Sequence, residues 1–233
     1  MSNTIKKLIT HDGSFHTDDI FAAATLSIML ETEGTPFEII RSRNDEIVKS
    51  GDYVFDVGMI DDPSTNHFDH HQSGGAGKRE NGIDYASFGL VWKKFGEKVS
   101  GSKEVANIID GRLITPIDAA DNAINLVDFK LDIRPYFIQS AFGVFYPTWK
   151  NLSPEALYDG FMKCVSFAKE ILLREIEHTT DMLEAKQAVI DLYNNSQDKR
   201  IIVLDKKYPY EEIISNFPEP MFVVYPRVDG CFG

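Results

Sequence analysis

Histidine and aspartate residues are concentrated near the start of this chain. Five of the six histidines in its 233 residues lie between positions 11 and 71, in two segments, 11–19 and 67–71, that also carry aspartates. These side chains together are ligands for first-row divalent metals, and neither segment contains a cysteine, which argues against a structural zinc site. Any single histidine here would ordinarily be a surface or capping residue. The clustering therefore indicates a metal centre, with Mn²⁺ favoured and Mg²⁺, Co²⁺ or Zn²⁺ as alternatives.

Two divalent ions that share aspartate and histidine ligands are suited to the hydrolysis of phosphate esters. They polarise the phosphoryl oxygens, lower the pKa of a bridging water and hold nucleophile and leaving group in line. A glycine-rich polar loop at residues 73–82 carries Lys78 and Arg79, which could close over a phosphate. A solvated surface loop is an equally good interpretation of that segment. A zinc amidohydrolase and a metal-binding regulatory protein without turnover are the alternatives from other classes.

The elements around the two segments must position these side chains. Apolar strands and one helical pattern alternate over the first 57 residues, which is typical of an α/β fold with a mainly parallel sheet flanked by helices. Thr17 or Asp18 could cap the helix. The expected elements are a strand at 6–10, a helix at 18–30, and strands at 37–40 and 53–57.

The predicted sheet would bring two of these regions together. Open α/β sheets bind their ligands at the carboxyl ends of the strands. His11 directly follows the first predicted strand, and Asp56 lies near the end of the third. Asp56 also stands within an apolar run, where an unpaired carboxylate is costly and a bound cation would remove the cost. A solvated carboxylate at a strand end is the simpler interpretation.

The remainder of the chain is predicted to be mostly helical, with a short α/β end. Asp118 and Asp121 are a further acidic pair at helical spacing, which alone would be a solvated helix face. Aromatic residues at 142, 145, 146 and 149 could stack on bases but are more often core or interface residues. Helices are expected at 86–95, 104–127, 154–193 (with a break allowed) and 210–216, and strands at 200–204 and 221–225. The predicted parts are a metal-binding catalytic domain at 1–130, a helical connecting region at 131–195 and a small α/β part at 196–233.

Composition limits the classes of partner and compartment. With 24 Lys+Arg against 36 Asp+Glu, the net charge of −12 argues against binding to long duplex DNA, which needs a broad basic surface. No apolar run approaches the ~20 residues that span a membrane. Two cysteines, Cys164 and Cys231, argue for a reducing compartment, and His11 leaves no room for a preceding targeting peptide. We therefore expect a cytoplasmic protein. A homodimer is compatible with this sequence.

Residues 69–71, Asp-His-His, resemble the defining motif of the DHH phosphoesterase superfamily. The closer resemblance is to the melanocyte proliferating gene 1 family, described as DHH-like, metal-dependent 3′–5′ exonucleases acting on RNA. Five motifs similar to those of that family occur in order, most densely between residues 8 and 125. They are residues 10–19 (THDGSFHTDD), 56–58 (DVG), 68–72 (FDHHQ), 86–92 (ASFGLVW) and 118–122 (DAADN).

The resemblance implies a role for each matching residue before the Asp-His-His motif. His11, His16 and Asp18 would take the positions of the superfamily's first His-Asp-Asp motif, with one residue inserted and His16 in place of an aspartate. Asp56 would be the carboxylate that bridges two metal ions. The exchange at position 16 leaves the number of ions open.

The later motifs would complete the site. His70 would be a metal ligand, with Asp69 beside it and His71 nearer the substrate phosphate. Either Asp118 or Asp121 would supply the last carboxylate. The chain stops at Gly233, where relatives usually continue into a substrate-gripping region, so the C-terminal part is expected to be truncated.

The leading hypothesis is a divalent-metal phosphodiesterase, a 3′–5′ exonuclease on RNA or short single-stranded oligonucleotides. Water bound to the metals would attack the terminal phosphodiester, and His71 with the loop cations Lys78 and Arg79 would stabilise the developing charge. The nearest alternative is the same site acting on a small phosphate compound, such as a pyrophosphate or a nucleoside bisphosphate.

Overall fold

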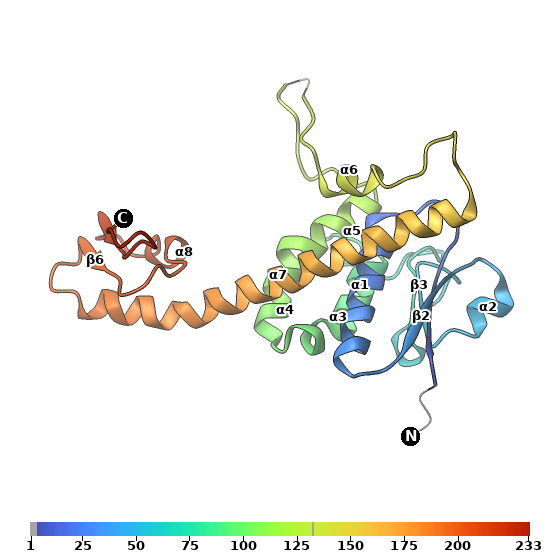
Figure 1. Cartoon of the computed structure of the whole chain (residues 1–233), viewed down its shortest axis with the longest axis horizontal. Helices are drawn as coiled ribbons and strands as arrows, with labels where there is room; N and C mark the ends of the chain where they lie inside the picture. The colour runs from blue at the N-terminus through green and yellow to red at the C-terminus, as the bar shows by residue number, and fades with distance from the viewer. Residues whose placement is uncertain (1–3, 132) are drawn as a thin grey trace. The chain divides into compact units, whose positions relative to one another are not determined.

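The structure is a computed structural model in which residues 4–131 and 133–233 are described. The chain forms two compact units, Met1–Arg174 and Glu175–Gly233. The first unit holds the sheet and the helices around it (Figure 1). The α/β class predicted from the sequence is confirmed, whereas the predicted boundaries at 130 and 195 stay a prediction.

The central sheet of the first unit is mostly parallel. Its strand order is β2-β1-β3-β5-β4, and only the last pair is antiparallel. The strands are β1 (Lys6–Thr10), β2 (Phe37–Arg41), β3 (Tyr53–Phe55), β4 (Asp61–Asp62) and β5 (His67–Phe68). The predicted strand at 53–57 ends two residues early because Asp56 has a positive φ of 55°, which takes the chain out of the extended conformation.

Helices cover both faces of this sheet. On one face Phe95 of α3 (Ser87–Ser100) packs against Phe68 and Tyr53. On the other face Val48 of α2 (Asp45–Lys49) packs with Ile9 and Val54. Figure 1 shows α2 and α3 on opposite sides of the strands. The alternation of side chains along a strand places neighbouring residues on these two faces.

Helix α1 (Thr17–Thr32) forms the centre of the first unit. All of its residues from Thr17 to Leu30 are buried, because it packs against α3, α5 (Thr115–Asp121), α6 (Ile138–Gly143) and the strands β1 and β2. Phe21 of α1 stacks on Phe88 of α3, with ring centroids 5.0 Å apart. The start of α1 is fixed by Asp19, whose Oδ1 accepts a hydrogen bond from the backbone N–H of His16 at 3.0 Å.

The predicted helix at 104–127 is confirmed up to residue 121 and is wrong for residues 122–127. The chain forms α4 (Lys103–Ile109), a π-helical turn η2 (Asp110–Ile114) and α5 (Thr115–Asp121). The π-helical turn ends two residues before Pro116, which cannot donate a backbone hydrogen bond to the preceding turn. Helix α5 then ends because Ala123 adopts a left-handed conformation, with a φ of 57°. The next helix is α6 (Ile138–Gly143).

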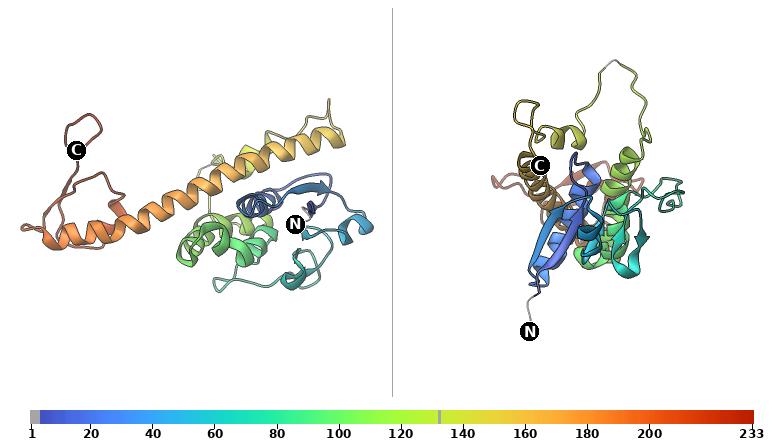
Figure 2. Two further views of the ribbon diagram at one scale, coloured as in Figure 1. Left: turned by 60° about the horizontal axis from the view of Figure 1, so that its bottom comes forward. Right: turned by 90° about the vertical axis from the view of Figure 1, so that its right-hand side faces the viewer.

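Helix α7 (Pro154–Asn195) is continuous over 42 residues, so the break that the sequence allowed is not present (Figure 2). In the second unit, β6 (Ile201–Val203) pairs in parallel with β7 (Phe222–Val224), and α8 (Glu211–Ile214) lies between them in sequence. The buried core of this unit comprises Val189, Tyr193, Ile202, Leu204, Ile213 and Ile214. Among the helices of the described residues, none has a stretch long and apolar enough to cross a bilayer.

Candidate metal centre

Three neighbouring parallel strands end at the same place. His11 directly follows β1, Asp56 directly follows β3, and residues 69–71 directly follow β5. Because β1, β3 and β5 are adjacent in the sheet, their carboxyl ends lie side by side. The sequence-based expectation that His11 and Asp56 lie at one sheet edge is confirmed. The positive φ of Asp56 is tolerated by aspartate and asparagine better than by most other residues.

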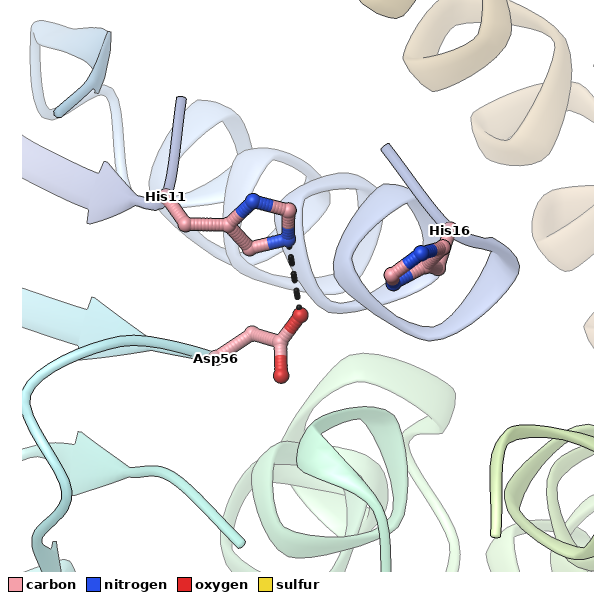
Figure 3. A group of neighbouring side chains, drawn as sticks. All are labelled: His11, His16 and Asp56. Carbon is pink, nitrogen blue, oxygen red and sulfur yellow. Dashed lines mark ion pairs between the residues drawn. The ribbon is translucent and has the colours of Figure 1, made fainter. Parts of the chain in front are cut away.

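Two helix ends add further donors to this edge. His16 immediately precedes α1 and Asp18 stands in its first turn, whereas Asp121 is the last residue of α5. Three groups of side chains have donor atoms within 4.8 Å of one another: His11, His16 and Asp56; Asp56, His70 and His71; and His16, Asp18 and Asp121. Figure 3 shows the first group, with the His11 ring directed at Asp56. Asp56 and His16 each belong to two groups, so the three sets form one continuous cluster.

The cluster contains buried polar atoms that lack partners. Among the described residues, five buried atoms of the cluster make no hydrogen bond. They are both carboxylate oxygens of Asp18, one oxygen each of Asp19 and Asp56, and Nε2 of His70. Unpaired buried carboxylates are costly, and such atoms are normally satisfied. The His70 Nε2 atom lies 3.2 Å from Asp121 Oδ2 and 3.3 Å from Asp56 Oδ1. This donor set therefore fits divalent cations placed between the carboxylates and the rings.

His11 presents a metal-binding atom in its neutral form. Its Nδ1 atom lies 2.9 Å from the carbonyl oxygen of Asp12, so an Nδ1–H donates there and leaves Nε2 with a lone pair. Nε2 faces Asp56 Oδ2 at 3.0 Å and Asp19 Oδ2 at 3.2 Å. Burial lowers the pKa of His11, but Asp19 and Asp56 outweigh that effect and raise it to about 10. Without a metal ion, a proton occupies this position.

The pKa values of the carboxylates in the cluster are shifted in opposite directions by this environment. Burial, together with the charges of Asp56 and Asp121, raises the pKa of Asp18 well above its usual range. Burial also raises the pKa of Asp19. Burial acts in the same direction on Asp56, but its contacts with His11 and His70 prevail and lower the pKa. The negative charge in this pocket is only partly neutralised by the histidines, which is the electrostatic condition for cation binding.

His71 is held by Asp69 at the solvent side of the cluster. Its Nδ1 atom lies 2.8 Å from Asp69 Oδ1, and its backbone N–H donates to the same oxygen at 3.1 Å. The other oxygen of Asp69 accepts a hydrogen bond from the N–H of Met59 at 2.6 Å. The hydrogen bond that the His71 ring donates to Asp69 raises the pKa of His71. The His71 side chain is 52 % exposed, so an oriented imidazole faces incoming solutes.

Besides Asp69, which contacts His71, three of the predicted site residues lie outside the cluster. Arg79 is buried and donates to Asp118 Oδ2 at 2.7 Å and to Asp110 Oδ1 at 3.0 Å, so it is committed to an internal ion pair and not to a solute. The remaining oxygen of Asp118 accepts the N–H of Gly89 at 3.1 Å. Lys78 is exposed and pairs with Asp84 at 2.8 Å. Of the two candidates for the last carboxylate, the geometry favours Asp121.

Two residues that contact the candidate ligands were missed by sequence reasoning. Asp19 faces His11 Nε2, and Ser87, the first residue of α3, donates its hydroxyl to Asp56 Oδ1 at 3.1 Å. Asp19 has a recognisable signal, because it stands three residues after the residue preceding the helix, as in a capping box. Ser87 has only a weak signal in the sequence, since a serine at a helix start is ordinarily a capping residue.

Fold and site together define an α/β protein with a carboxylate–histidine centre for divalent metal at the carboxyl edge of a parallel sheet. The profile of the family described as "MYG1_exonuc: Uncharacterised protein family (UPF0160)" matches residues 7–229. The chain therefore belongs to this family.

The curated relatives are similar over different lengths of the chain. A MYG1 protein of Schizosaccharomyces pombe is 24% identical over 90% of this chain and 70% of its own length. "MYG1 exonuclease" of Bos taurus is 28% identical over 72% of this chain and 49% of its own length. "MYG1 exonuclease" of Homo sapiens is 33% identical over 50% of this chain and 35% of its own length. No solved structure is significantly similar to the chain.

Proposed function

We propose that this chain is a metal-dependent phosphodiesterase that shortens RNA or short single-stranded oligonucleotides from the 3′ end, with two Mn²⁺ ions as cofactor. The observation that carries the proposal is the position of Asp56. Its carboxylate belongs to two of the three donor groups, and one of its buried oxygens has no hydrogen-bond partner among the described residues. A carboxylate shared between two adjacent donor sets suits a two-ion phosphoesterase. The name "MYG1 exonuclease" of the human and bovine relatives supports the same class of reaction.

The donors would divide between two ions that share Asp56. His11 and His16 would join Asp56 at one ion, and His70 would join it at the other, where Asp121 lies 3.2 Å from His70 Nε2. When bound, the ions would supply Lewis-acid polarisation of the phosphoryl oxygens and a water of lowered pKa. Ser87 and Asp19 hold Asp56 and His11 in place through the contacts described above. The chain's own contribution is thus a rigid set of donors at the ends of three strands.

His71 is the residue placed to contact the substrate phosphate. Asp69 fixes the orientation of its ring and raises its pKa, which favours the imidazolium form. An imidazolium at the exposed side of the cluster can donate a hydrogen bond to a phosphoryl oxygen that gains negative charge. Arg79, held by two aspartates, and Lys78, paired with Asp84, do not take part in this proposal.

The substrate is short or small. A chain of net charge −12 repels a long polyanion, whereas a terminal phosphodiester at the metal centre is neutralised locally. The same charge favours a small phosphate compound as a second candidate substrate. Competition between an oligonucleotide and pyrophosphate for the metal-loaded protein distinguishes the two, because the preferred substrate inhibits cleavage of the other at the lower concentration.

A time course with RNA labelled at its 5′ end, in the presence of Mn²⁺, tests the reaction. The expected product is a ladder that shortens from the 3′ end with the wild-type chain and is absent with His70→Ala. His178→Ala is the matched control, because His178 is exposed on α7 and lies outside the cluster. Intact RNA with metal-loaded wild-type protein, or equal ladders from wild type and His70→Ala, would contradict the nuclease proposal.

A further inference from the structure

A cavity of about 340 Å³ lies beside the metal centre in the first unit. His16 and Asp121 line this cavity and also belong to the donor cluster, so the cavity adjoins the cluster. A group joined covalently to a phosphate at the metals can therefore extend into the cavity. The apolar part of its wall is formed by Phe15, Ile20, Ile117, Ala120, Phe142 and Tyr146.

The wall of the cavity suits a flat aromatic group. The rings of Phe15 and Tyr146 lie with their centroids 4.7 Å apart, and Phe142 is 2 % exposed, so the aromatic surface is firmly held. Aromatic and apolar side chains of this kind stack on nucleobases without regard to sequence.

One polar side chain stands in this apolar surrounding. Gln139 belongs to the wall, because Gln139, Phe142, Gly143 and Tyr146 follow one another at helical spacing along α6 and the turn after it. A primary amide both donates and accepts hydrogen bonds, so it can pair with a ligand that has a hydrogen-bonding edge.

We propose that this cavity binds the base and ribose of the single nucleotide whose phosphate is held at the metal centre. A nucleobase combines a flat aromatic face with hydrogen-bonding groups along its edge, which matches the rings and the Gln139 amide of the wall. The volume accommodates one nucleoside and not a run of nucleotides, so the products are mononucleotides. This inference rests on the proposed phosphodiesterase function for the origin of the phosphate, but the cavity can be tested without it.

Equilibrium dialysis can measure the binding of adenosine to the metal-free protein. This measurement tests the cavity without catalysis. Wild type is expected to bind adenosine, and Gln139→Leu to bind it about five- to tenfold more weakly through loss of one hydrogen bond. The melting temperature of Gln139→Leu should stay near that of wild type, because Gln139 is only partly buried. Failure of wild type to bind adenosine, or equal binding by the two proteins, would overturn the proposal.

A kinetic comparison links the cavity to the reaction. Ala120→Phe places a ring in the cavity wall, and the control Ser140→Phe adds the same ring at an exposed position of α6 away from the lining face. The kcat/KM for an RNA trinucleotide, divided by that for methyl p-nitrophenyl phosphate, is expected to fall at least tenfold in Ala120→Phe and to stay at the wild-type value in Ser140→Phe. An unchanged ratio in Ala120→Phe would overturn the nucleoside site.

The two assays separate the failure of this inference from the failure of the proposed function. If wild type hydrolyses neither ester, the phosphodiesterase function is wrong, and adenosine binding still decides whether the cavity is a nucleoside site. If wild type hydrolyses both esters and binds no adenosine, the function stands and the cavity has no such role.

Discussion

The Nη1 atom of Arg79 donates a hydrogen bond to Oδ2 of Asp118 over 2.7 Å, and both side chains are almost fully buried. Gly89 makes this pair possible, because a Cβ atom at that position would lie 1.9 Å from Asp118 Oδ2. The pair ties the loop that follows the Asp-His-His motif to helix α5. Asp118 therefore has a structural partner, whereas Asp121, three residues later, reaches the donor cluster.

Substitutions of these two aspartates should have opposite effects. Asp118→Asn is expected to lower the free energy of unfolding by about 2 kcal/mol, since it removes one of the two carboxylates that pair with the Arg79 guanidinium, and to leave the number of bound Mn²⁺ ions unchanged. Asp121→Asn should change the unfolding free energy little and weaken Mn²⁺ binding at least tenfold. Urea unfolding and calorimetric Mn²⁺ titration measure the two quantities. A folded Asp118→Asn protein that lost Mn²⁺ while Asp121→Asn kept it would reverse the assignment.

Asp18→Asn should stabilise the metal-free protein. Burial and the neighbouring carboxylates raise the pKa of Asp18, so its ionised form is unfavourable in the folded state, and neutral asparagine removes roughly 1 kcal/mol of this cost at pH 7. The same substitution should reduce the rise in melting temperature that saturating Mn²⁺ produces in wild type. Thermal unfolding with and without Mn²⁺ checks both effects. A metal-free variant less stable than wild type would show that Asp18 is not under electrostatic strain.

Metal binding should release protons. The pKa of His11 is raised to about 10 in the metal-free protein, so Nε2 carries a proton at pH 7 that a metal ion must displace. We expect the release of about one proton for each ion that His11 binds. At pH values below the pKa of His11, the affinity for the metal ion should rise about tenfold with each unit of pH. Titration calorimetry in two buffers of different ionisation enthalpy measures the release, which should be smaller in His11→Gln.

The raised pKa of His11 also makes the stability of the metal-free protein depend on pH. The folded pKa of His11 lies above its ordinary value of 6.5, so its protonation stabilises the metal-free fold fully below pH 6.5, and this contribution is lost as the pH rises toward 10. Metal-saturated protein should lack this dependence, because the ion replaces the proton. An equal loss of stability between pH 7 and 10 in both forms would contradict this account.

The two cysteines should differ in reactivity. Cys164 is fully buried in α7, and burial raises the pKa of its thiol to about 12, so only ~10⁻⁴ of it is thiolate at pH 8. Cys231 is exposed. Ellman's reagent should titrate one thiol rapidly in the native protein and two in guanidinium chloride. Cys231→Ser should abolish the rapid phase, and rapid reaction of that variant would show that Cys164 is accessible.

Prediction from sequence succeeded where a local pattern determines position. His11 and Asp56 follow apolar strands, and the rule that parallel strands end at one edge places them together. The strand β5 is too short, at two residues, to produce a pattern of its own, so the sheet position of the Asp-His-His segment could not be read from periodicity.

Prediction was less complete where a residue's role depends on contacts distant in the sequence. The spacing of Asp118 and Asp121 made them equivalent candidates, and only the approach of Arg79, 39 residues earlier, separates them. The end of α5 depends on the left-handed conformation of Ala123, for which an alanine gives no sequence signal. Both outcomes are set by tertiary structure.

The donors of the cluster come from positions as far apart as His11 and Asp121, on three strands and two helices. A newly synthesised chain therefore offers no high-affinity site until its first half has been made and folded. An ion would then be captured after folding, with the exposed rings of His16 and His71 as its most accessible donors. The ions available to the folded protein, rather than to the nascent chain, would decide which metal is bound.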